Sequence, residues 1–341
     1  MKLKRILAAI LGGIMVLSMA ACNGSSQNSA APESTGGTES TPAATESSAE
    51  KSNADIRIGV ILKTLSSEYW GYVAAGVKQA QKDLGVQVDL EGPPSETSFN
   101  EQSNMIETML SAGKIDALCI APLQPDMVVT KLQDATIPVL FVDTDANYDK
   151  KVTFIGTGNE EAAKKGGEYI AKLIGSGKKA VLIGGVQGDP TNEARMKGYT
   201  EALKAGGIEV LDTQYANATA DKAVQVMENF MQNFPQIDAV LCNNDDMAIG
   251  AQRAAAQAGK ADKIKFMGFD GIATACQSII DGKETASVAQ SPYDMGYKAV
   301  ENAVKAVKGE SVEKLIDSGS TIVDASNAKD YLDKLNKMTG K

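Results

Sequence analysis

Residues 56–62 read Ile-Arg-Ile-Gly-Val-Ile-Leu, an apolar run with the length of one buried β-strand. The next segment has a helical period, with apolar residues recurring on one face at Val73, Val77, Ala80 and Leu84. Gly85 follows that face directly, and glycine commonly ends a helix. A strand followed at once by an amphipathic helix predicts a parallel sheet that helices cover on both faces.

The same alternation of strand and helix continues along the chain. Strands are predicted at 56–62, 87–91, 115–121 and 137–142 and, after Gly158, near 180–184, 208–213, 237–242, 264–268 and 285–289. A chain of 341 residues is also long for one domain. We therefore predict an α/β protein with two doubly wound parallel-sheet lobes.

An internal repeat supports the division into two lobes. Residues 115–119 (Ile-Asp-Ala-Leu-Cys) match residues 237–242 (Ile-Asp-Ala-Val-Leu-Cys) apart from one extra residue. In each half the next strand leads to an aspartate, Asp143 or Asp270, six residues after its first isoleucine. Ligands of open α/β sheets bind outside the carboxyl ends of the strands, so the repeat predicts two facing carboxylates, one per lobe. The alternative is two solvated aspartates that only cap turns.

Composition excludes several classes of function. Apolar residues make up 43% and charged residues 23%, which is the balance of a globular protein with a core. The net charge of −9 disfavours a surface for nucleic acid, which needs clustered Lys and Arg. The sequence has no histidine, which excludes Ser-His-Asp and Cys-His catalysis and histidine-based zinc or haem sites.

The first residues have the pattern of an export signal. Lys2, Lys4 and Arg5 precede an apolar run at 6–21, shorter than the ~20 residues that a membrane span needs. The run ends at Met19-Ala20-Ala21-Cys22, which resembles the lipobox of bacterial lipoproteins, although Met19 stands where Leu is usual. We predict a signal peptide at 1–21 and lipidation of Cys22, which anchors the chain to the membrane. The alternative is an unprocessed signal with an incidental cysteine.

A polar tether is predicted between Cys22 and the folded body. Residues 23–54 consist mainly of Ser, Thr, Ala, Glu, Gly and Pro, so the segment 22–54 is predicted to be a disordered linker that begins with the lipidated cysteine. Removal of the signal deletes three positive charges and no negative one, which takes the net charge from −9 to −12. The remaining cysteines show no disulfide framework and are predicted to be buried thiols: Cys119, Cys242 and Cys276.

The turn after the first strand carries side chains suited to a sugar. Tyr69 and Trp70 fall in the opening turn of the predicted helix, and Trp70 is the only tryptophan. A sugar needs flat apolar walls and converging hydrogen-bonding groups, since a buried unpaired hydroxyl is costly. The alternative is that both rings only pack the helix onto the sheet.

The second half carries polar groups at corresponding places. Arg195 begins a helical segment and can donate two parallel hydrogen bonds, although a surface arginine is also commonplace. Asn243 and Asn244 end a predicted strand and either bind ligand or cap the next helix. With Asp270 and Gln290, Asn244 would form a polar set at the ends of three successive strands.

Other motifs predict no cofactor and no metal. The glycine-rich stretches at 156–158 and 184–188 lack the spacing of a dinucleotide loop. The segment 175–179 has Lys179 where a P-loop needs Ser or Thr, and it precedes its strand. Asp245 and Asp246 lack the ladder of ligands of a calcium loop.

From Asp55 to about Val323 the chain resembles the ribose-binding class of periplasmic sugar-binding proteins, and most closely the D-allose-binding type. The resemblance rests on ordered motifs: 62–66 running into Tyr69-Trp70, 139–143, Arg195-x-x-Gly198-Tyr199, 244–250, 268–271 and 289–292. It implies a type I periplasmic binding protein fold, in which a hinge joins the lobe 55–157 plus 291–319 to the lobe 158–290 plus 320–341. It also implies these sugar contacts: Lys63, Tyr69, Trp70, Asp143, Arg195, Asn244, Asp270 and Gln290.

The sequence departs from that family at three places in the expected pocket. Ser67 stands where a sugar-contacting Asn is usual, and Thr144 stands where ribose binders have Arg. Ala218 falls at about the position of an aromatic wall residue. The pocket is therefore expected to be roomier, and the sequence does not name the sugar.

The resemblance implies an extracytoplasmic lipoprotein that captures an allose-like or ribose-like monosaccharide. It would act as a monomer without cofactor and deliver the sugar to the permease of an ABC transporter. An alternative is a sensor that presents a sugar or a signalling furanose to a membrane receptor. A glycosidase using Asp143 and Asp270 as paired carboxylates is a third possibility.

Overall fold

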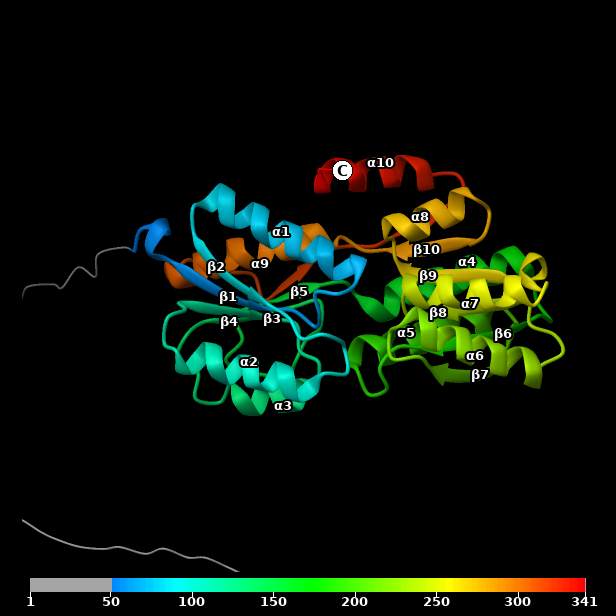
Figure 1. The fold of residues 1–341 in the computed structure, drawn as a ribbon, viewed down its shortest axis with the longest axis horizontal. Coiled ribbons are helices and arrows are strands. Elements are labelled where there is room, and N and C mark those ends of the chain that lie inside the picture. The colour runs from blue at the N-terminus through cyan, green and yellow to red at the C-terminus, as the bar shows by residue number, and fades with distance from the viewer. Residues whose placement is uncertain (1–50, 341) are drawn as a thin grey trace, which may run out of the picture. The chain divides into compact units, whose positions relative to one another are not determined.

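The computed structural model describes residues 51–340, which contain two six-stranded sheets (Figure 1). Strand order is β11-β5-β4-β3-β1-β2 in the first sheet and β12-β10-β9-β8-β6-β7 in the second. All neighbouring strands are parallel except β10 and β12. The prediction of two doubly wound α/β lobes is therefore confirmed. The predicted signal peptide, Cys22 and the linker up to residue 50 lie outside the described residues.

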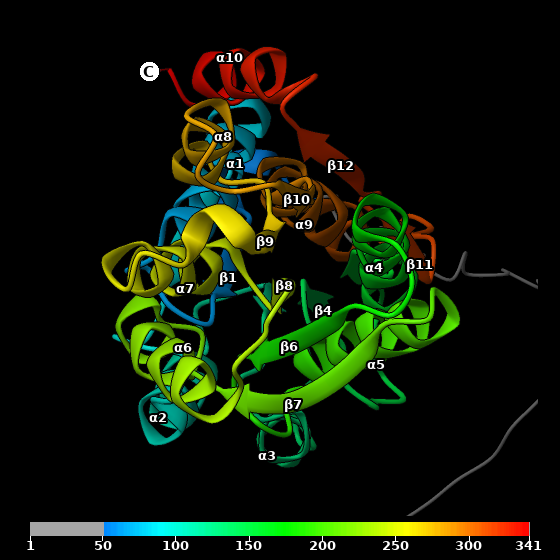
Figure 2. The same cartoon turned by 90° about the vertical axis from the view of Figure 1, so that its right-hand side faces the viewer.

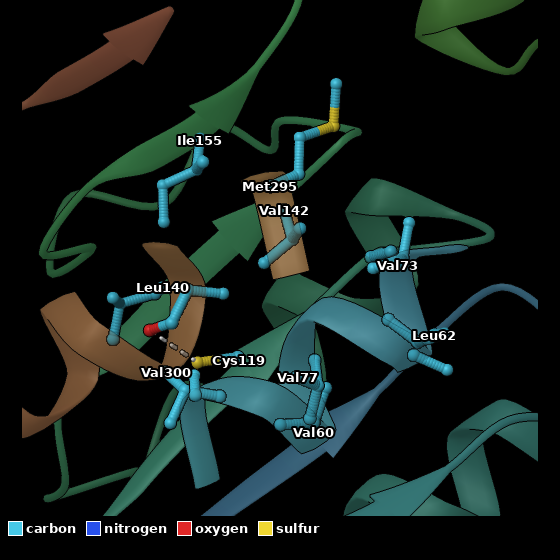
Figure 3. Close-up of a cluster of buried hydrophobic side chains, with 14 of the residues drawn as sticks. Val60, Leu62, Val73, Val77, Cys119, Leu140, Val142, Ile155, Met295 and Val300 are labelled. Carbon is cyan, nitrogen blue, oxygen red and sulfur yellow. Dashed lines mark hydrogen bonds between the residues drawn. The ribbon is translucent and has the colours of Figure 1, made fainter. Parts of the chain in front are cut away.

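The first sheet has two helices on each face. Its strands are β1 (Arg57–Ile61), β2 (Gln87–Glu91), β3 (Ala117–Ile120), β4 (Val139–Val142), β5 (Phe154–Gly156) and β11 (Leu315–Asp317). Helices α1 (Glu68–Leu84) and α9 (Pro292–Val307) cover one face, and α2 (Phe99–Ser111) and α3 (Pro125–Lys131) cover the other (Figure 1). Figure 3 shows Val60 of β1, Val77 of α1 and Val300 of α9 packed in the core under the first face.

The second sheet repeats this arrangement. Its strands are β6 (Lys179–Gly184), β7 (Glu209–Tyr215), β8 (Ala239–Cys242), β9 (Lys265–Asp270), β10 (Ala286–Ala289) and β12 (Thr321–Asp324). Helices α4 (Asn159–Ile174) and α5 (Pro190–Ala205) lie on one side, and α6 (Ala220–Asn233) and α7 (Asp245–Gln257) on the other (Figure 2). Helices α8 (Ala273–Ile280) and α10 (Ala328–Thr339) share a small core near β10.

The chain passes between the two sheets three times, after β5, after β10 and between β11 and β12. A hydrogen bond links the segment after β5 to the segment after β11, since the hydroxyl oxygens of Thr157 and Ser318 lie 2.9 Å apart. The two lobes also share apolar contacts, because Ile272 and Ala275 of the second lobe are buried in the apolar core of the first.

Some details differ from the sequence predictions. Strands β5, β11 and β12 were not predicted, because runs of three or four residues carry little periodicity and β11 and β12 lie at sheet edges. The short 3₁₀ helix Asn53–Asp55 is fixed to the body, with the Asn53 amide donating to the Leu84 carbonyl at 2.7 Å. A second 3₁₀ turn, Ala261–Lys263, precedes β9.

The three cysteines of the body are free and buried, as predicted. The Cys119 thiol donates to the Ala299 carbonyl at 3.4 Å (Figure 3). Burial raises the pKa of the Cys119 thiol to about 12, so it stays protonated and packs as an apolar side chain. Within residues 51–340, no helix has the length and apolar character needed to cross a bilayer.

Candidate functional site

Asp143 and Asp270 both lie at the carboxyl edges of their sheets. Asp143 directly follows β4 and Asp270 is the last residue of β9, with positive φ angles of 64° and 122°. Such angles are costly for residues other than glycine and are common where function needs a particular side-chain direction. Asp143 accepts hydrogen bonds from the Tyr69 hydroxyl at 2.7 Å and the Thr144 hydroxyl at 2.9 Å.

Asp270 is enclosed by polar side chains of its own lobe. Its carboxylate accepts a hydrogen bond of 2.8 Å from the Gln290 amide and lies 3.7 Å from the Arg195 guanidinium. Burial raises the pKa of Asp270 well above its usual range, and the attraction of Arg195 offsets this only in part. Asp143 is among the charges that raise this pKa further, so the two carboxylates lie near enough to repel each other.

Arg195 is held in place from three directions. Its Nε donates to the Asn159 side chain and its Nη1 to the Asn243 carbonyl, both at 2.8 Å. The guanidinium carbon also lies 3.8 Å from the centre of the Phe269 ring, which is a cation–π contact. A guanidinium fixed in this way loses little entropy when it binds an oxygen of a ligand.

The aromatic pair begins α1, where the Ser67 hydroxyl caps the helix by accepting from the Trp70 amide. Ser67 therefore has a structural role as the N-cap of α1. The rings of Tyr69 and Trp70 meet edge to face, with centroids 5.2 Å apart. The Trp70 Nε1 donates to Glu96 at 2.8 Å. Trp70 both packs into the core and lines the site.

Lys63 contacts the opposite lobe. Its ammonium forms an ion pair with Asp189, and both side chains are buried. Burial alone would lower the pKa of Lys63, but the nearby carboxylates of Asp189, Glu96 and Asp143 outweigh it and raise the pKa. Asp189 also caps α5 by accepting from the Thr191 and Asn192 amides.

Asn244 has the capping role that was one of its two predicted roles. Its side-chain oxygen accepts from the Met247 amide at 2.9 Å, and its amide donates to the Ala218 carbonyl at 3.2 Å. Asn244 therefore fixes the loop of Asn217 and Ala218, which both have positive φ angles. Gln290 is almost fully buried, and its side-chain oxygen has no partner among the described residues.

A cavity of about 280 Å³ lies between these groups. Both lobes line it: Thr64, Ser66, Ser67, Glu68, Tyr69, Trp70, Ser95 and Glu96 from the first, and Asn217, Ala218, Thr219, Ala220, Asn244, Asp246 and Asp270 from the second. Of the predicted site residues, four line the cavity: Tyr69, Trp70, Asn244 and Asp270. Three others contact these four: Asp143 contacts Tyr69, and Arg195 and Gln290 contact Asp270. Lys63 is paired with Asp189 instead.

Two site residues have no counterpart in the sequence analysis. Glu96 lies in the loop between β2 and α2, which no sequence pattern linked to the aromatic pair. Asp189 precedes Pro190 at the start of α5, so a helix cap could have been predicted, but its pairing with Lys63 depends on the contact between lobes. No cluster of three or more metal-binding side chains occurs within residues 51–340.

A family model and several characterised proteins match this sequence. A family model described as a periplasmic binding protein domain matches residues 58–311. The D-allose-binding periplasmic protein of Escherichia coli (strain K12) is 34% identical over 268 residues, which are 74% of this chain and 85% of that protein. The ribose import binding protein of the same organism is 33% identical over 262 residues, which are 75% of this chain and 86% of that protein.

A solved structure is similar over most of the chain. The ABC transporter periplasmic solute-binding protein of Actinobacillus succinogenes, with bound D-allose, superposes with a TM-score of 0.75 and 25% sequence identity. The match covers 81% of this chain and all of that one.

Proposed function

The chain belongs to the periplasmic binding protein family, and on that premise we propose that it captures a monosaccharide between its lobes and delivers it to an ABC transporter. The related proteins are binding proteins for transport, so the chain is a binding protein and not an enzyme. The relatives named above bind allose or ribose, so the class of ligand is better supported than any one sugar.

The cavity is the observation that carries this proposal. It combines an aromatic pair with carboxylates from both lobes and amides from the second, and its volume suits one small polar molecule. Hydrogen bonds to fixed groups and contact with Trp70 allow tight but reversible binding, and contact from both lobes couples binding to closure. The proposed sugar contacts remain those implied by the resemblance, with Glu96 of the cavity wall added.

A titration monitored by the fluorescence of Trp70 tests the proposal. Because Trp70 is the only tryptophan and lines the cavity, we expect its emission to change when a sugar binds beside it. The panel consists of aldopentoses, aldohexoses, deoxy sugars and inositols. A thermal shift provides an independent signal, since a ligand at 100 times its Kd stabilises by about 2.7 kcal/mol.

Trp70→Phe should abolish the emission change while some binding, measured by calorimetry, persists. Trp70→Ala should weaken binding by on the order of 1 to 3 kcal/mol, because buried apolar contact is lost. A role in core packing alone predicts a lower Tm with unchanged affinity. A panel with no binding sugar would refute the proposed function.

We also propose that Cys22 is lipidated and anchors the chain at the extracytoplasmic face of the membrane, where it acts as a monomer. The wild-type protein should then partition with membranes, and Cys22→Ser should remain unprocessed or become soluble. Cys119→Ser is the matched control, because Cys119 is a buried thiol of the folded body. Unchanged processing and membrane partitioning of Cys22→Ser would contradict the anchor.

A further inference from the structure

The backbone that places Asp270 at the cavity wall has two consecutive residues with positive φ angles. Asp270 has a φ of 122° and Gly271 has a φ of 74°. The angle is ordinary for glycine and strained for aspartate, so contacts with the surrounding chain have to hold it. The direction of the Asp270 carboxylate therefore depends on whatever fixes the turn that follows it.

One buried carboxylate fixes both amides of that turn. The Ile272 amide donates to the Asp245 carboxylate at 2.9 Å. The Gly271 amide donates to the Ser287 hydroxyl at 3.1 Å, and this hydroxyl donates to the other oxygen of Asp245 at 2.6 Å. The two residues that follow Asp270 are thus tied to Asp245, one directly and one through Ser287.

The close packing of α7 on β9 brings Asp245 to this turn (Figure 2). Asp245 is the first residue of α7, and its carboxylate lies against the backbone of Gly268 in β9. A Cβ atom at residue 268 would overlap this carboxylate, so the approach needs glycine there. The motif Gly268-Phe269-Asp270-Gly271 therefore provides both the space for Asp245 and the turn that it holds.

Asp245 does not reach the ligand cavity itself. Its side chain is fully buried and is not among the described residues that line the cavity. Burial raises the pKa of Asp245 well above its usual range, and the nearby Glu284 raises it further. Its hydrogen-bond donors are neutral groups, which offset the cost of burying a carboxylate only in part. Any effect of Asp245 on binding has to pass through the turn after Asp270.

A second aspartate of the same lobe makes the same kind of bond far from the cavity. Asp238 accepts a hydrogen bond of 2.9 Å from the Lys179 amide. It directly precedes β8, at the amino edge of the sheet, whereas Asp270 lies at the carboxyl edge. Asp238 therefore matches Asp245 as a carboxylate that binds a backbone amide, but it has no link to Asp270.

On the premise of the sugar-binding function proposed above, we propose that Asp245 is a positioning residue that sets the direction of the Asp270 carboxylate toward the bound sugar. It does so by fixing the two amides that follow Asp270 in the chain. Without these bonds the strained φ of Asp270 can relax. A hydrogen bond to the sugar weakens steeply when its angle changes, so the relaxed carboxylate binds the sugar less well.

Asp245→Asn tests this role by calorimetry on the full chain. The variant keeps the size of the side chain, but its amide nitrogen cannot accept the hydrogen bond from Ile272 or from Ser287. The probes are D-allose, D-ribose, D-fucose and myo-inositol, and the one that wild type binds most tightly is used throughout. We expect Asp245→Asn to lower the affinity about tenfold. Asp238→Asn is the matched control and should leave the affinity unchanged.

Double variants separate positioning from a general loss of structure. In the Asp270→Ala background, Asp245→Asn should cause almost no further loss, because the group that Asp245 positions is gone. In the Asp143→Ala background the loss should again be about tenfold, because Asp143 belongs to the other lobe and does not depend on this turn. A purely structural role of Asp245 predicts equal losses in both backgrounds.

Ser287→Ala is a second, milder variant, which removes only the link between Asp245 and the Gly271 amide. It should lower the affinity less than Asp245→Asn does, with the same dependence on Asp270. Equal losses in the Asp270→Ala and Asp143→Ala backgrounds would overturn the inference while sugar binding stands. Wild-type affinity in both Asp245→Asn and Ser287→Ala would do the same. If wild type binds none of the four probes, the proposed function fails as well.

Discussion

Asp270→Ala is expected to lower the affinity for the best sugar of the panel by about a hundredfold. The substitution removes an acceptor at the cavity wall and leaves the buried Arg195 without its carboxylate neighbour at 3.7 Å. A charged hydrogen bond to the ligand contributes roughly 1.5 to 3 kcal/mol to affinity, and the upper end corresponds to about a hundredfold. The loss of the buried partner of Arg195 should in addition lower folding stability. Calorimetry of purified wild type and variant measures the difference.

Asp143→Ala should cause a smaller loss, of at least about tenfold, because the neighbours of Asp143 are the neutral hydroxyls of Tyr69 and Thr144. Asp149→Ala is the matched control, since Asp149 is an exposed aspartate in the loop after β4. Melting curves should show folded protein for all three variants. Wild-type affinity in both Asp143→Ala and Asp270→Ala would remove these aspartates from the binding site.

Stability is expected to fall as pH rises from about 4.5 to 8, and Glu284 is expected to cause much of this fall. The side chain is 5% exposed, and neither carboxylate oxygen has a hydrogen-bond partner among the described residues. Burial raises the pKa of Glu284 from 4.5 to about 8. The folded protein therefore keeps the proton over a range of pH in which the unfolded chain has lost it.

The sign of the effect follows from the raised pKa. The contribution of protonated Glu284 to stability is present below pH 4.5 and is lost as pH rises to about 8. For one group with this shift the loss is roughly 3 to 5 kcal/mol. Glu284→Gln and Glu284→Met should remove this part of the pH dependence and unfold at higher urea than wild type at pH 8.

Glu228→Gln is the control, since Glu228 is an exposed residue of α6, and it should follow the wild-type profile. Asp245 and Asp270 also have raised pKa values, through burial first, so some pH dependence should remain in the Glu284 variants. Identical unfolding profiles for Glu284→Met and wild type at pH 5 and pH 8 would contradict the prediction.

The strands and helices could be predicted where the local pattern was long. The run at 56–62 becomes β1, and Gly85 ends α1 with a φ of 67°. The pattern failed at β5 and β11, which have three residues each and gain their hydrogen bonds from distant neighbours in the sheet. Such short strands form because a partner is present and not because their residues favour it.

Some residues of the candidate site could likewise be predicted from the sequence, and others could not. The repeat that ends at Asp143 and Asp270 depends on strand ends, which are local, so both residues could be named from the sequence as candidates. The partners of Lys63 and Trp70 could not, because Asp189 and Glu96 come from segments that are brought near only by folding. The cap that the Asn244 oxygen forms on α7 was likewise seen only in the structure, and its predicted role in ligand binding stays a prediction.

By itself, the sequence determined two α/β lobes with polar residues at corresponding strand ends, because hydrophobic period and strand length are local properties of the chain. Only the tertiary structure decided the charge balance of the cavity. That balance depends on which carboxylates have a cation within reach, and the ion pair between Lys63 and Asp189 joins residues that are 126 positions apart in the chain. The energy between two charges depends on their distance in space, and that distance is known only once the whole chain has folded.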